Sequence, residues 1–280
     1  PKSEIKDTIS DSNWSKHIDY LRSIKDVVGT RQNIAAALKK SILNNLPNEP
    51  FGILLSGGVD SSIIAKICKD ENIPFRCFCV GMKGSEDLKV AKEIARLLEL
   101  KLVFKEFELD EIEELLIKVI AILPSPIIQD DNYIEYMVKV SVSTVLLAAM
   151  SLGDEKIFYS GIGAEELFAG YQRHVKSVSE GGTWRGIAIK ELEEESWDGL
   201  KRLNNLVISR DKLISESVTK EIISPYIDDE LIILAMSLST DEKIDSVTNK
   251  KMLREIAKDI GVPREAYNRK KKGAQYGSSF

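Results

Sequence analysis

The spacing of apolar residues predicts helices at the start of the chain. Between residues 16 and 46, apolar positions such as Ile34, Leu38 and Ile42 recur at intervals of about one or two helical turns. Pro47 ends this pattern, because proline does not continue a helix. We therefore expect a pair of helices that leads into the core.

From Phe51 onward, short apolar runs alternate with amphipathic segments. The runs predict strands at residues 51–55, 75–80, 102–107 and 156–159. The segments between them predict helices at residues 61–70, 85–99, 110–123 and 132–152. Such alternation, with strands that are apolar throughout, is typical of a parallel sheet covered by helices on both faces. The sequence thus predicts an α/β fold with a doubly wound parallel sheet.

After about Gly170 the strand signal stops, and helical patterns follow near residues 185–206, 228–238 and 249–260. We expect a helical lead-in at residues 1–50, an α/β ligand-binding core at 51–170, and a helical part at 171–280 that completes the site. In a doubly wound sheet, ligands bind beyond the carboxyl ends of the strands. Functional residues should therefore follow strands directly.

Composition and charge exclude several classes of protein. The 280 residues are 43% apolar and 30% charged, which is ordinary for a globular protein and unlike a collagenous, disordered or disulfide-scaffold chain. The net charge of -5 argues against surfaces that coat nucleic acid or adsorb to membranes. The first 25 residues lack the apolar region of a signal peptide, and the longest apolar run, at 145–150, is too short to span lipid. We expect a cytoplasmic protein with no nucleic-acid or membrane partner.

The cysteines and histidines do not predict a metal site. Cys77 and Cys79 should share one face of a strand, and together with Cys68 they lack the paired spacing of zinc ligands. We expect all three to be buried apolar side chains. His17 and His174 are expected at the surface, with a smaller chance that His174 lines a site.

A loop rich in glycine and serine follows the first expected strand. It reads Ser56-Gly57-Gly58-Val59-Asp60-Ser61-Ser62. Glycines let the backbone approach a ligand closely, and the N–H groups and hydroxyls at a helix start form a cradle for an anion. Asp60 would repel a bare phosphate, so its position indicates a Mg²⁺ ion that bridges the carboxylate and a polyphosphate. The alternative is a plain strand-to-helix turn capped by serine.

This loop resembles the PP-loop, S-G-G-x-D-S, of the ATP pyrophosphatases. In that superfamily the loop holds the β- and γ-phosphates of ATP as pyrophosphate leaves. The resemblance implies an ATP site made by Ser56, Gly57, Gly58, Asp60, Ser61 and Ser62. The Walker pattern G-x-x-x-x-G-K-[ST] does not occur in the chain. The loop alone does not separate GMP, NAD, argininosuccinate and asparagine synthetases.

A second motif follows the fourth expected strand. It reads Ser160-Gly161-Ile162-Gly163-Ala164-Glu165-Glu166-Leu167-Phe168-Ala169-Gly170-Tyr171 and resembles the asparagine synthetase signature S-G-x-G-[AS]-D-E-L-F-x-G-Y. Three later segments resemble further motifs of that family in the same order, namely Pro225-Tyr226-Ile227-Asp228, Lys250-Lys251-Met252-Leu253-Arg254 and Arg269-Lys270-Lys271. The resemblance runs from about Phe51 to Ser279.

The resemblance assigns roles to single residues. Asp60 would be a Mg²⁺ ligand, and Glu165 would be a second metal carboxylate at a position where the family has aspartate. Ser160 and Gly161 match residues that touch the adenylate. Lys271 matches a lysine that stabilises charge on the phosphates and on the tetrahedral intermediate. The implied cofactors are ATP and Mg²⁺, and the implied reaction is amidation of a carboxylate through an acyl-adenylate, with AMP and pyrophosphate released.

Simpler interpretations of the same residues remain. Glu165 and Glu166 could be first-turn acidic residues favoured by the helix dipole. The basic run from Arg269 to Lys272 could be a solvated tail. A third acidic and amide cluster, Asp130-Asp131-Asn132, is expected to cap a helix, with a smaller chance of substrate contact.

Two departures from the family pattern bear on substrate and partners. Ile162 stands where asparagine synthetases have an acidic residue that faces the acyl centre, which weakens the case for aspartate as substrate. Alternatives are a related ligase that uses another carboxylate or an internal amine, as in the β-lactam synthetase branch, or a nucleotide-binding regulatory module without catalysis. The chain starts at Pro1 and shows no glutaminase nucleophile, so we expect it to use ammonia, with any glutaminase supplied by a separate domain or subunit. A homodimer is compatible with the sequence.

Overall fold

The computed structural model describes residues 10–124, 133–171, 174, 183–184, 187–188, 191–270 and 273–280. The chain forms two compact units. The sheet unit comprises Pro47–Ser160, Ser209–Ile223 and Gly261–Phe280. The helical unit comprises Pro1–Leu46, Gly161–Ile208 and Ser224–Ile260. The three-part division expected from the sequence stays a prediction.

The sheet unit contains a parallel sheet of five strands in the order β3-β2-β1-β4-β7. Its strands are β1 (Phe51–Leu54), β2 (Phe75–Met82), β3 (Leu102–Phe107), β4 (Ile157–Tyr159) and β7 (Glu221–Ile223). The predicted doubly wound α/β fold is confirmed. The expectation that no strand follows Gly170 is wrong, because β7 pairs with β4 and the described residues also include a hairpin of β5 (Thr183–Trp184) and β6 (Ile187–Ala188).

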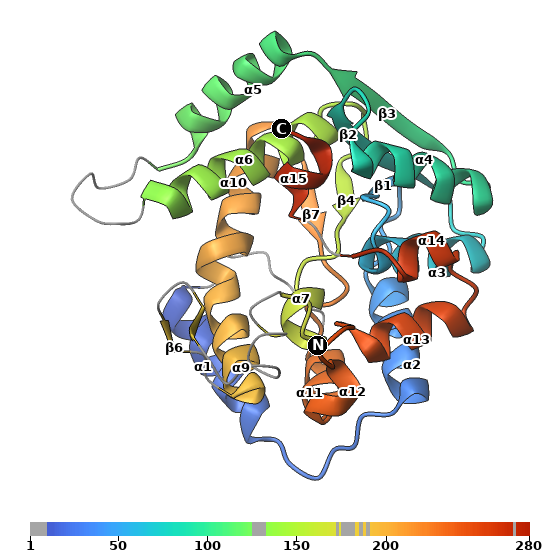
Figure 1. Cartoon of the computed structure of the whole chain (residues 1–280), viewed down its shortest axis with the longest axis vertical. Helices are drawn as coiled ribbons and strands as arrows, with labels where there is room; N and C mark the ends of the chain where they lie inside the picture. Colours follow the sequence, from blue (N-terminus) through green and yellow to red (C-terminus); the bar gives the residue numbers. More distant parts are fainter. Residues whose placement is uncertain are drawn as a thin grey trace. The chain divides into compact units, whose positions relative to one another are not determined.

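Helices cover both faces of the sheet (Figure 1). They are α3 (Val59–Asp70), α4 (Glu86–Leu97), α5 (Leu109–Ile122), α6 (Tyr133–Met150) and α10 (Ser209–Ser217), followed by the short α14 (Arg264–Tyr267) and α15 (Ala274–Ser278). Phe78 and Phe158, whose rings meet edge to face at 5.1 Å, join a core cluster with residues of α5, α6 and α10. The rings of Phe51 and Tyr159 meet at a tilt of 36°, with their centroids 4.6 Å apart. Because successive strand residues alternate in direction, these two rings lie on the opposite face.

The three cysteines belong to this core. Cys68, Cys77 and Cys79 are free and buried, as predicted. Burial raises the pKa of Cys68 and Cys79 to about 12 and also raises the pKa of Cys77. The thiols therefore stay protonated at neutral pH and act as small apolar side chains.

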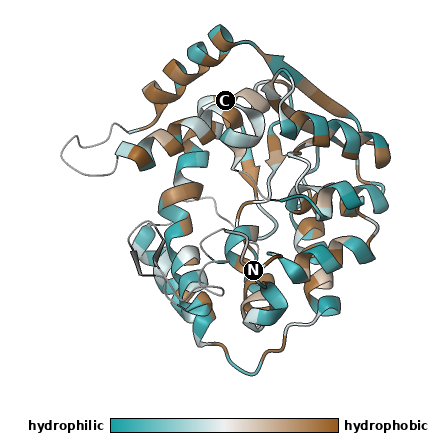
Figure 2. Ribbon diagram, viewed as in Figure 1, coloured by the Kyte–Doolittle hydropathy of each residue, from teal (hydrophilic) through white to brown (hydrophobic). Residues whose placement is uncertain are grey.

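Helix α6 meets the length and composition of a membrane span, which its short continuous apolar run did not suggest. About 44% of this 18-residue helix is buried, and Val140, Leu146, Leu147 and Met150 lie in the core cluster. A core helix of a soluble protein satisfies the same criterion. Figure 2 shows that the neighbouring α5 is also largely apolar, and its Ile117 and Ile120 are exposed.

The helical unit contains the predicted N-terminal pair of helices and most of the later ones. Its helices are α1 (Asp11–Ser23), α2 (Arg31–Asn44), α7 (Ala164–Leu167), α9 (Leu192–Leu203), the π-helix η1 (Asn204–Ile208), α11 (Asp229–Met236), α12 (Thr240–Lys243) and α13 (Lys251–Asp259). Helix α2 begins with a capping box in which Thr30 and Asn33 satisfy each other's backbone N–H. The indole of Trp14 donates to the carbonyl of Leu200 at 2.7 Å and so joins α1 to α9.

The helical unit contains a buried lysine at the end of α12. Lys243, at the end of α12, is 2% exposed, and its Nζ lies 3.6 Å from the sulfur of Met236. Burial lowers the pKa of Lys243 to about 8, although the nearby Glu193 and Glu242 act in the opposite direction. Because burial is the larger effect, this buried ammonium opposes folding at neutral pH.

Lys243 should make the folding stability depend on pH. The folded chain releases this proton near pH 8, whereas the unfolded chain holds it to about pH 10.5, so the unfolded state binds more protons in that window and the stability rises with pH. The rise should amount to about 3 kcal/mol. We expect Lys243→Met to lack it and to be more stable than the parent at pH 7.

Urea unfolding of both proteins at pH 7 and pH 10 tests this prediction. The parent-minus-variant difference isolates Lys243 from the buried thiols, which titrate at high pH in both proteins. Lys251→Met is the control, because the side chain of Lys251 is 35% exposed. An equal pH response in the parent and Lys243→Met would refute the assignment.

Candidate active site

The glycine- and serine-rich loop lies at the point where the sheet reverses its strand order. Strand β1 pairs with β2 on one side and with β4 on the other, so the carboxyl ends of β1 and β4 are neighbours. Ser56 follows β1 and Ser160 follows β4, where its backbone N–H donates to the carbonyl of Ile223 at 3.0 Å. Both serines belong to the sheet unit. The structure thus brings together two predicted site segments that are about 100 positions apart in the sequence.

Gly57 is the residue of the loop whose position demands glycine. Its φ of +73° belongs to the left-handed region. A Cβ at this position would lie 2.7 Å from Val90 Cγ1 and 2.9 Å from the backbone nitrogen of Ala91, both in α4. The loop therefore packs directly onto α4, and Gly58 then caps the N-terminus of α3 with an extended backbone.

Hydroxyl groups surround the start of α3. The Oγ of Ser61 donates to the carbonyl of Gly58 at 3.4 Å, and Ser56 is exposed. Ser62 and Ser160 are buried, and among the described residues neither Oγ has a hydrogen-bond partner. Buried polar atoms in folded proteins almost always have partners, so two such hydroxyls flanking a helix N-terminus indicate a polar ligand.

Asp60 occupies the first turn of α3 and is 8% exposed. The N-terminus of a helix stabilises negative charge, so the carboxylate is favoured there even without a metal. Asp60 and the serine hydroxyls offer the oxygen donors that Mg²⁺ prefers. The chemistry of these donors fits the implied ion, although no group of three or more His, Cys, Asp or Glu side chains forms a metal site within the described part of the chain.

The second motif continues into the helical unit, where it forms a tight turn and the short helix α7. Gly163 caps α7 with a φ of +89°. Glu165 is buried on α7, and its Oε1 accepts from Nζ of Lys250 at 2.6 Å. A Cβ on Gly170 would lie 1.9 Å from Oε2 of Glu165 and 2.3 Å from Cε of Lys250, so this ion pair fills the space left by a glycine.

Lys250, from the later segment at residues 250–254, had no role assigned from the sequence. It is 1% exposed and adopts a left-handed backbone with φ 54° immediately before α13. Its ammonium neutralises Glu165, so ligation of a metal by the Oε1 of Glu165 would require Lys250 to move. The second-ligand role of Glu165 therefore stays a proposal, made with this competing partner in view.

A neighbouring cluster contains Glu166, Tyr171 and His174. The hydroxyl of Tyr171 donates to Oε1 of Glu166 at 2.7 Å, and the ring of His174 meets that of Tyr171 edge to face at 5.3 Å. His174 is 1% exposed, so the expectation of a surface position is wrong. Its ring packs against an aromatic face, which a polar sequence context did not reveal. His17 is exposed and pairs with Asp229, as expected of a surface histidine.

The later motifs support the second motif from within the helical unit. Asp228 caps α11 by accepting from the N–H of Leu231 at 3.1 Å, and burial raises the pKa of Asp228. Tyr226 is buried beside the ring of Phe168, and a Cβ on Gly163 would lie 3.2 Å from Ile227. The turn at residues 225–228 thus packs beneath α7.

Lys271 and the cluster Asp130-Asp131-Asn132 lie outside the described residues. Gly161 and Glu165 belong to the helical unit, whereas the loop from Ser56 to Ser62 belongs to the sheet unit. Their joint role in one site stays a prediction.

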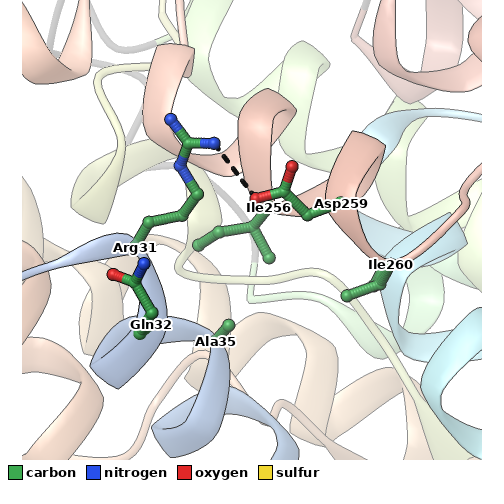
Figure 3. A pocket seen from close by; sticks show the side chains of 6 residues that line it. All are labelled: Arg31, Gln32, Ala35, Ile256, Asp259 and Ile260. Carbon is green, nitrogen blue, oxygen red and sulfur yellow. Dashed lines mark hydrogen bonds and ion pairs between the residues drawn. The ribbon is translucent and has the colours of Figure 1, made fainter.

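A separate pocket lies between α2 and α13 in the helical unit (Figure 3). Its lining residues are Arg31, Gln32, Ala35, Ile256, Asp259 and Ile260. Arg31 and Asp259 form an exposed ion pair at 3.1 Å across it. The pocket contains none of the residues predicted for the site, and its charges are already paired.

Lys250→Met should destabilise the chain by about 3–5 kcal/mol, because it leaves the Glu165 carboxylate buried without its cation. Unfolding in urea measures the change. Lys251→Met is the matched control, since the adjacent lysine forms a half-exposed pair with Asp245 at 3.5 Å and should cost less than about 1 kcal/mol. Similar losses in the two variants would show that the buried pair has no special role.

Comparisons with known proteins agree with these motifs. The sequence model of the family described as asparagine synthase matches residues 33–207 and 187–279. A Methanocaldococcus jannaschii protein assigned as asparagine synthetase (glutamine-hydrolyzing) 1 is 29% identical over 288 residues, covering 89% of this chain and 49% of that protein. Asparagine synthetase (glutamine-hydrolyzing) 1 of Arabidopsis thaliana is 30% identical over 230 residues, covering 75% of this chain and 35% of that protein.

The chain spans about half or less of the length of these curated relatives. Among solved structures, NMN synthetase from Francisella tularensis covers 67% of this chain and 92% of its own, but its TM-score of 0.32 and 13% identity are too low to carry an argument. The family match, by contrast, extends over most of the chain and includes every motif described above. The chain belongs to the asparagine synthase family.

Proposed function

We propose that the chain is an ATP-dependent carbon–nitrogen ligase that amidates a carboxylate and releases AMP and pyrophosphate. The observation that carries this proposal is the loop at the switch point of the sheet, where Gly57 permits close packing on α4 and two buried hydroxyls, of Ser62 and Ser160, lack partners among the described residues. A polyphosphate would supply those partners. Membership of the asparagine synthase family supports ATP as its source.

The proposed reaction has two steps. A carboxylate oxygen of the substrate attacks the α-phosphorus of ATP, and the bond from that phosphorus to the bridging oxygen breaks, so that pyrophosphate leaves and an acyl-adenylate forms. Ammonia then attacks the acyl carbon, loses a proton, and displaces AMP. The first step replaces a poor leaving group on the acyl carbon, an oxide, by a good leaving group, AMP.

The residues of the loop would bind and orient the leaving pyrophosphate. The backbone N–H groups at the start of α3 and the hydroxyls of Ser56, Ser61 and Ser62 would hold its oxygens, while Ser160 and Gly161 would contact the adenylate. Asp60 and Glu165 would hold Mg²⁺, which supplies positive charge against the phosphates when bound. Lys271 would stabilise the charge that develops on the phosphates and on the tetrahedral intermediate.

The nitrogen source is proposed to be ammonia. The names of the relatives describe glutamine-hydrolysing enzymes, and this chain covers 35–49% of those proteins. None of its three cysteines can serve as a glutaminase nucleophile in this fold, because Cys68, Cys77 and Cys79 are buried with raised pKa values. We propose that glutamine is used only when a glutaminase domain or subunit supplies ammonia.

Ile162 favours a substrate other than aspartate. It is partly buried in the turn before α7, and its carbonyl accepts from the hydroxyl of Ser224. An aliphatic side chain there cannot take the electrostatic role of the acidic residue found in asparagine synthetases. A ligase that adenylates another carboxylate, or that closes onto an internal amine as β-lactam synthetases do, is the second candidate.

A screen of carboxylic acids tests the proposal. The purified chain is incubated with ATP, Mg²⁺ and each amino acid or other carboxylic acid, with ammonium, with glutamine or with neither, and AMP, amide and glutamate are measured. We expect AMP and amide with ammonium and no glutamate from glutamine. AMP without added amine would indicate an internal amine, glutamate formation would refute ammonia dependence, and ATP binding without turnover of any acid would favour a regulatory module.

A further inference from the structure

The guanidinium of Arg269 joins three parts of the sheet unit. Its Nη1 donates to the carbonyl of Ser56 at 2.6 Å, its Nη2 to Oδ1 of Asp87 at 2.5 Å, and its Nε to Oε1 of Glu86 at 3.4 Å. Ser56 begins the glycine-rich loop, and the two carboxylates belong to the first turn of α4. The Arg269 and Asp87 side chains are each 9% exposed. The C-terminal segment is therefore bound to the loop and to α4 by one largely buried side chain.

Through these contacts Arg269 cross-links the loop and α4, and we call this set of hydrogen bonds the brace. The guanidinium is therefore not available as an anion-binding group. Each of its three nitrogens already donates to a protein oxygen, and two carboxylates more than offset its single positive charge. The planar fork of arginine suits such simultaneous contacts, whereas a lysine ammonium would hold one point. A phosphate would have to displace a carboxylate to bind here.

The contact with Ser56 determines where the next N–H points. The peptide bond between Ser56 and Gly57 is planar and trans, so the carbonyl of Ser56 and the N–H of Gly57 point in opposite directions. Because Arg269 holds the carbonyl, the Gly57 N–H is directed away from Arg269. A rotated peptide would remove one donor from the anion cradle.

The loop, α4 and α15 are tightly packed around Asp87. A Cβ on Gly277, in α15, would lie 2.0 Å from Oδ1 of Asp87. A Cβ on Gly57 would lie within 3.0 Å of atoms of Val90 and Ala91, which also belong to α4. The loop, the first turn of α4 and the C-terminal helix thus meet without room for added atoms.

We propose that Arg269 is a positioning residue, which fixes the peptide between Ser56 and Gly57 so that the loop can bind the phosphates of ATP. This inference rests on the proposed function in naming ATP as the ligand. Arg269 itself contacts no substrate. Its loss should therefore lower the rate by misplacing the loop, by roughly 10²-fold when a reacting group moves by about 1 Å.

The test compares four variants of the 280-residue chain. Arg269→Met removes the brace and leaves Asp87 buried without its cation, whereas Arg269→Met/Asp87→Leu removes both charges and should regain stability. Arg269→Lys keeps the charge without the fork. Arg96→Met is the control, because Arg96 also pairs with a carboxylate of α4, Glu93 at 2.7 Å, but is 68% exposed.

Three readouts distinguish positioning from a purely structural role. In both variants that carry Arg269→Met, we expect faster amide hydrogen exchange in residues 56–60 and a rate of AMP formation lower by roughly 10²-fold. We expect the double variant to unfold at the same urea concentration as the parent, so its lower rate would not come from lost stability. Arg269→Lys should recover part of the rate, and Arg96→Met should match the parent. Restoration of the parent rate in the stable double variant, or parent-like exchange in the loop, would overturn the inference.

Failure of the proposed function would look different. If the parent turned over no acid, ATP would not be established as a substrate, but exchange in the loop and binding of ATP with Mg²⁺ would still decide the role of Arg269. Unchanged ATP affinity and exchange in Arg269→Met would then contradict the positioning role.

Discussion

Asp60→Asn is expected to reduce AMP formation by roughly 10³-fold, because it removes a charge that would hold Mg²⁺ against the departing pyrophosphate. The amide keeps the volume of the carboxylate, and Asp60 sits in the first turn of α3, where asparagine is also tolerated. The fold should therefore survive. Initial rates of AMP release over a range of Mg²⁺ concentrations measure the effect, with circular dichroism to confirm the fold.

Asp70→Asn provides the matched control for Asp60. Asp70 lies at the other end of α3, where it forms a half-exposed pair with Lys66, and its loss should leave the rate within a few-fold of the parent. If Asp60→Asn also stays within a few-fold, Asp60 has no metal role and the loop is a plain strand-to-helix turn.

Lys271→Met is expected to lower the rate of amide formation by roughly 10²-fold or more, as when one preorganised charge is removed from a developing anion. The affinity for ATP should change less, because the lysine would act on charge that increases in the transition state. This prediction follows from the resemblance to the family's R-x-K segment. Steady-state rates at saturating ATP, with ATP binding measured separately, distinguish the two effects.

Lys270→Met is the control for this substitution, since Lys270 is exposed and adjacent. It should leave both rate and binding unchanged. If Lys271→Met weakens binding to ATP and to an unrelated polyanion alike, without a change in rate, the basic run is a solvated tail.

The sheet and its loop could be predicted because their signals are local. Parallel strands covered on both faces are apolar along their length, so β1, β4 and most of β2 appear as apolar runs. The edge strand β3 begins with an apolar run but also contains Lys105 and Glu106. The glycines and serines that follow β1 mark a backbone that turns sharply into a helix. Strand β7 was missed because its three residues are too few to show a period. Two adjacent isoleucines also occur in helices and loops, so they do not by themselves indicate a strand.

The ion pairs of the site could not be predicted because their partners are distant in sequence. Lys250 and Glu165 are 85 positions apart, and Arg269 and Asp87 are 182 apart. Each residue alone suggested a different role, Glu165 a metal ligand and Arg269 part of a basic tail. The burial of His174 was missed because its packing against the ring of Tyr171 depends on the folded structure.

Transfer of ¹⁸O from the carboxylate of the substrate tests the central claim most directly. The full chain is incubated with ATP, Mg²⁺, ammonium and an accepted acid labelled in both carboxylate oxygens, and the nucleotide products are analysed by mass spectrometry. An acyl-adenylate places one labelled oxygen in AMP when ammonia displaces it, and none in pyrophosphate. Label in inorganic phosphate with formation of ADP, or AMP without label, would contradict the account.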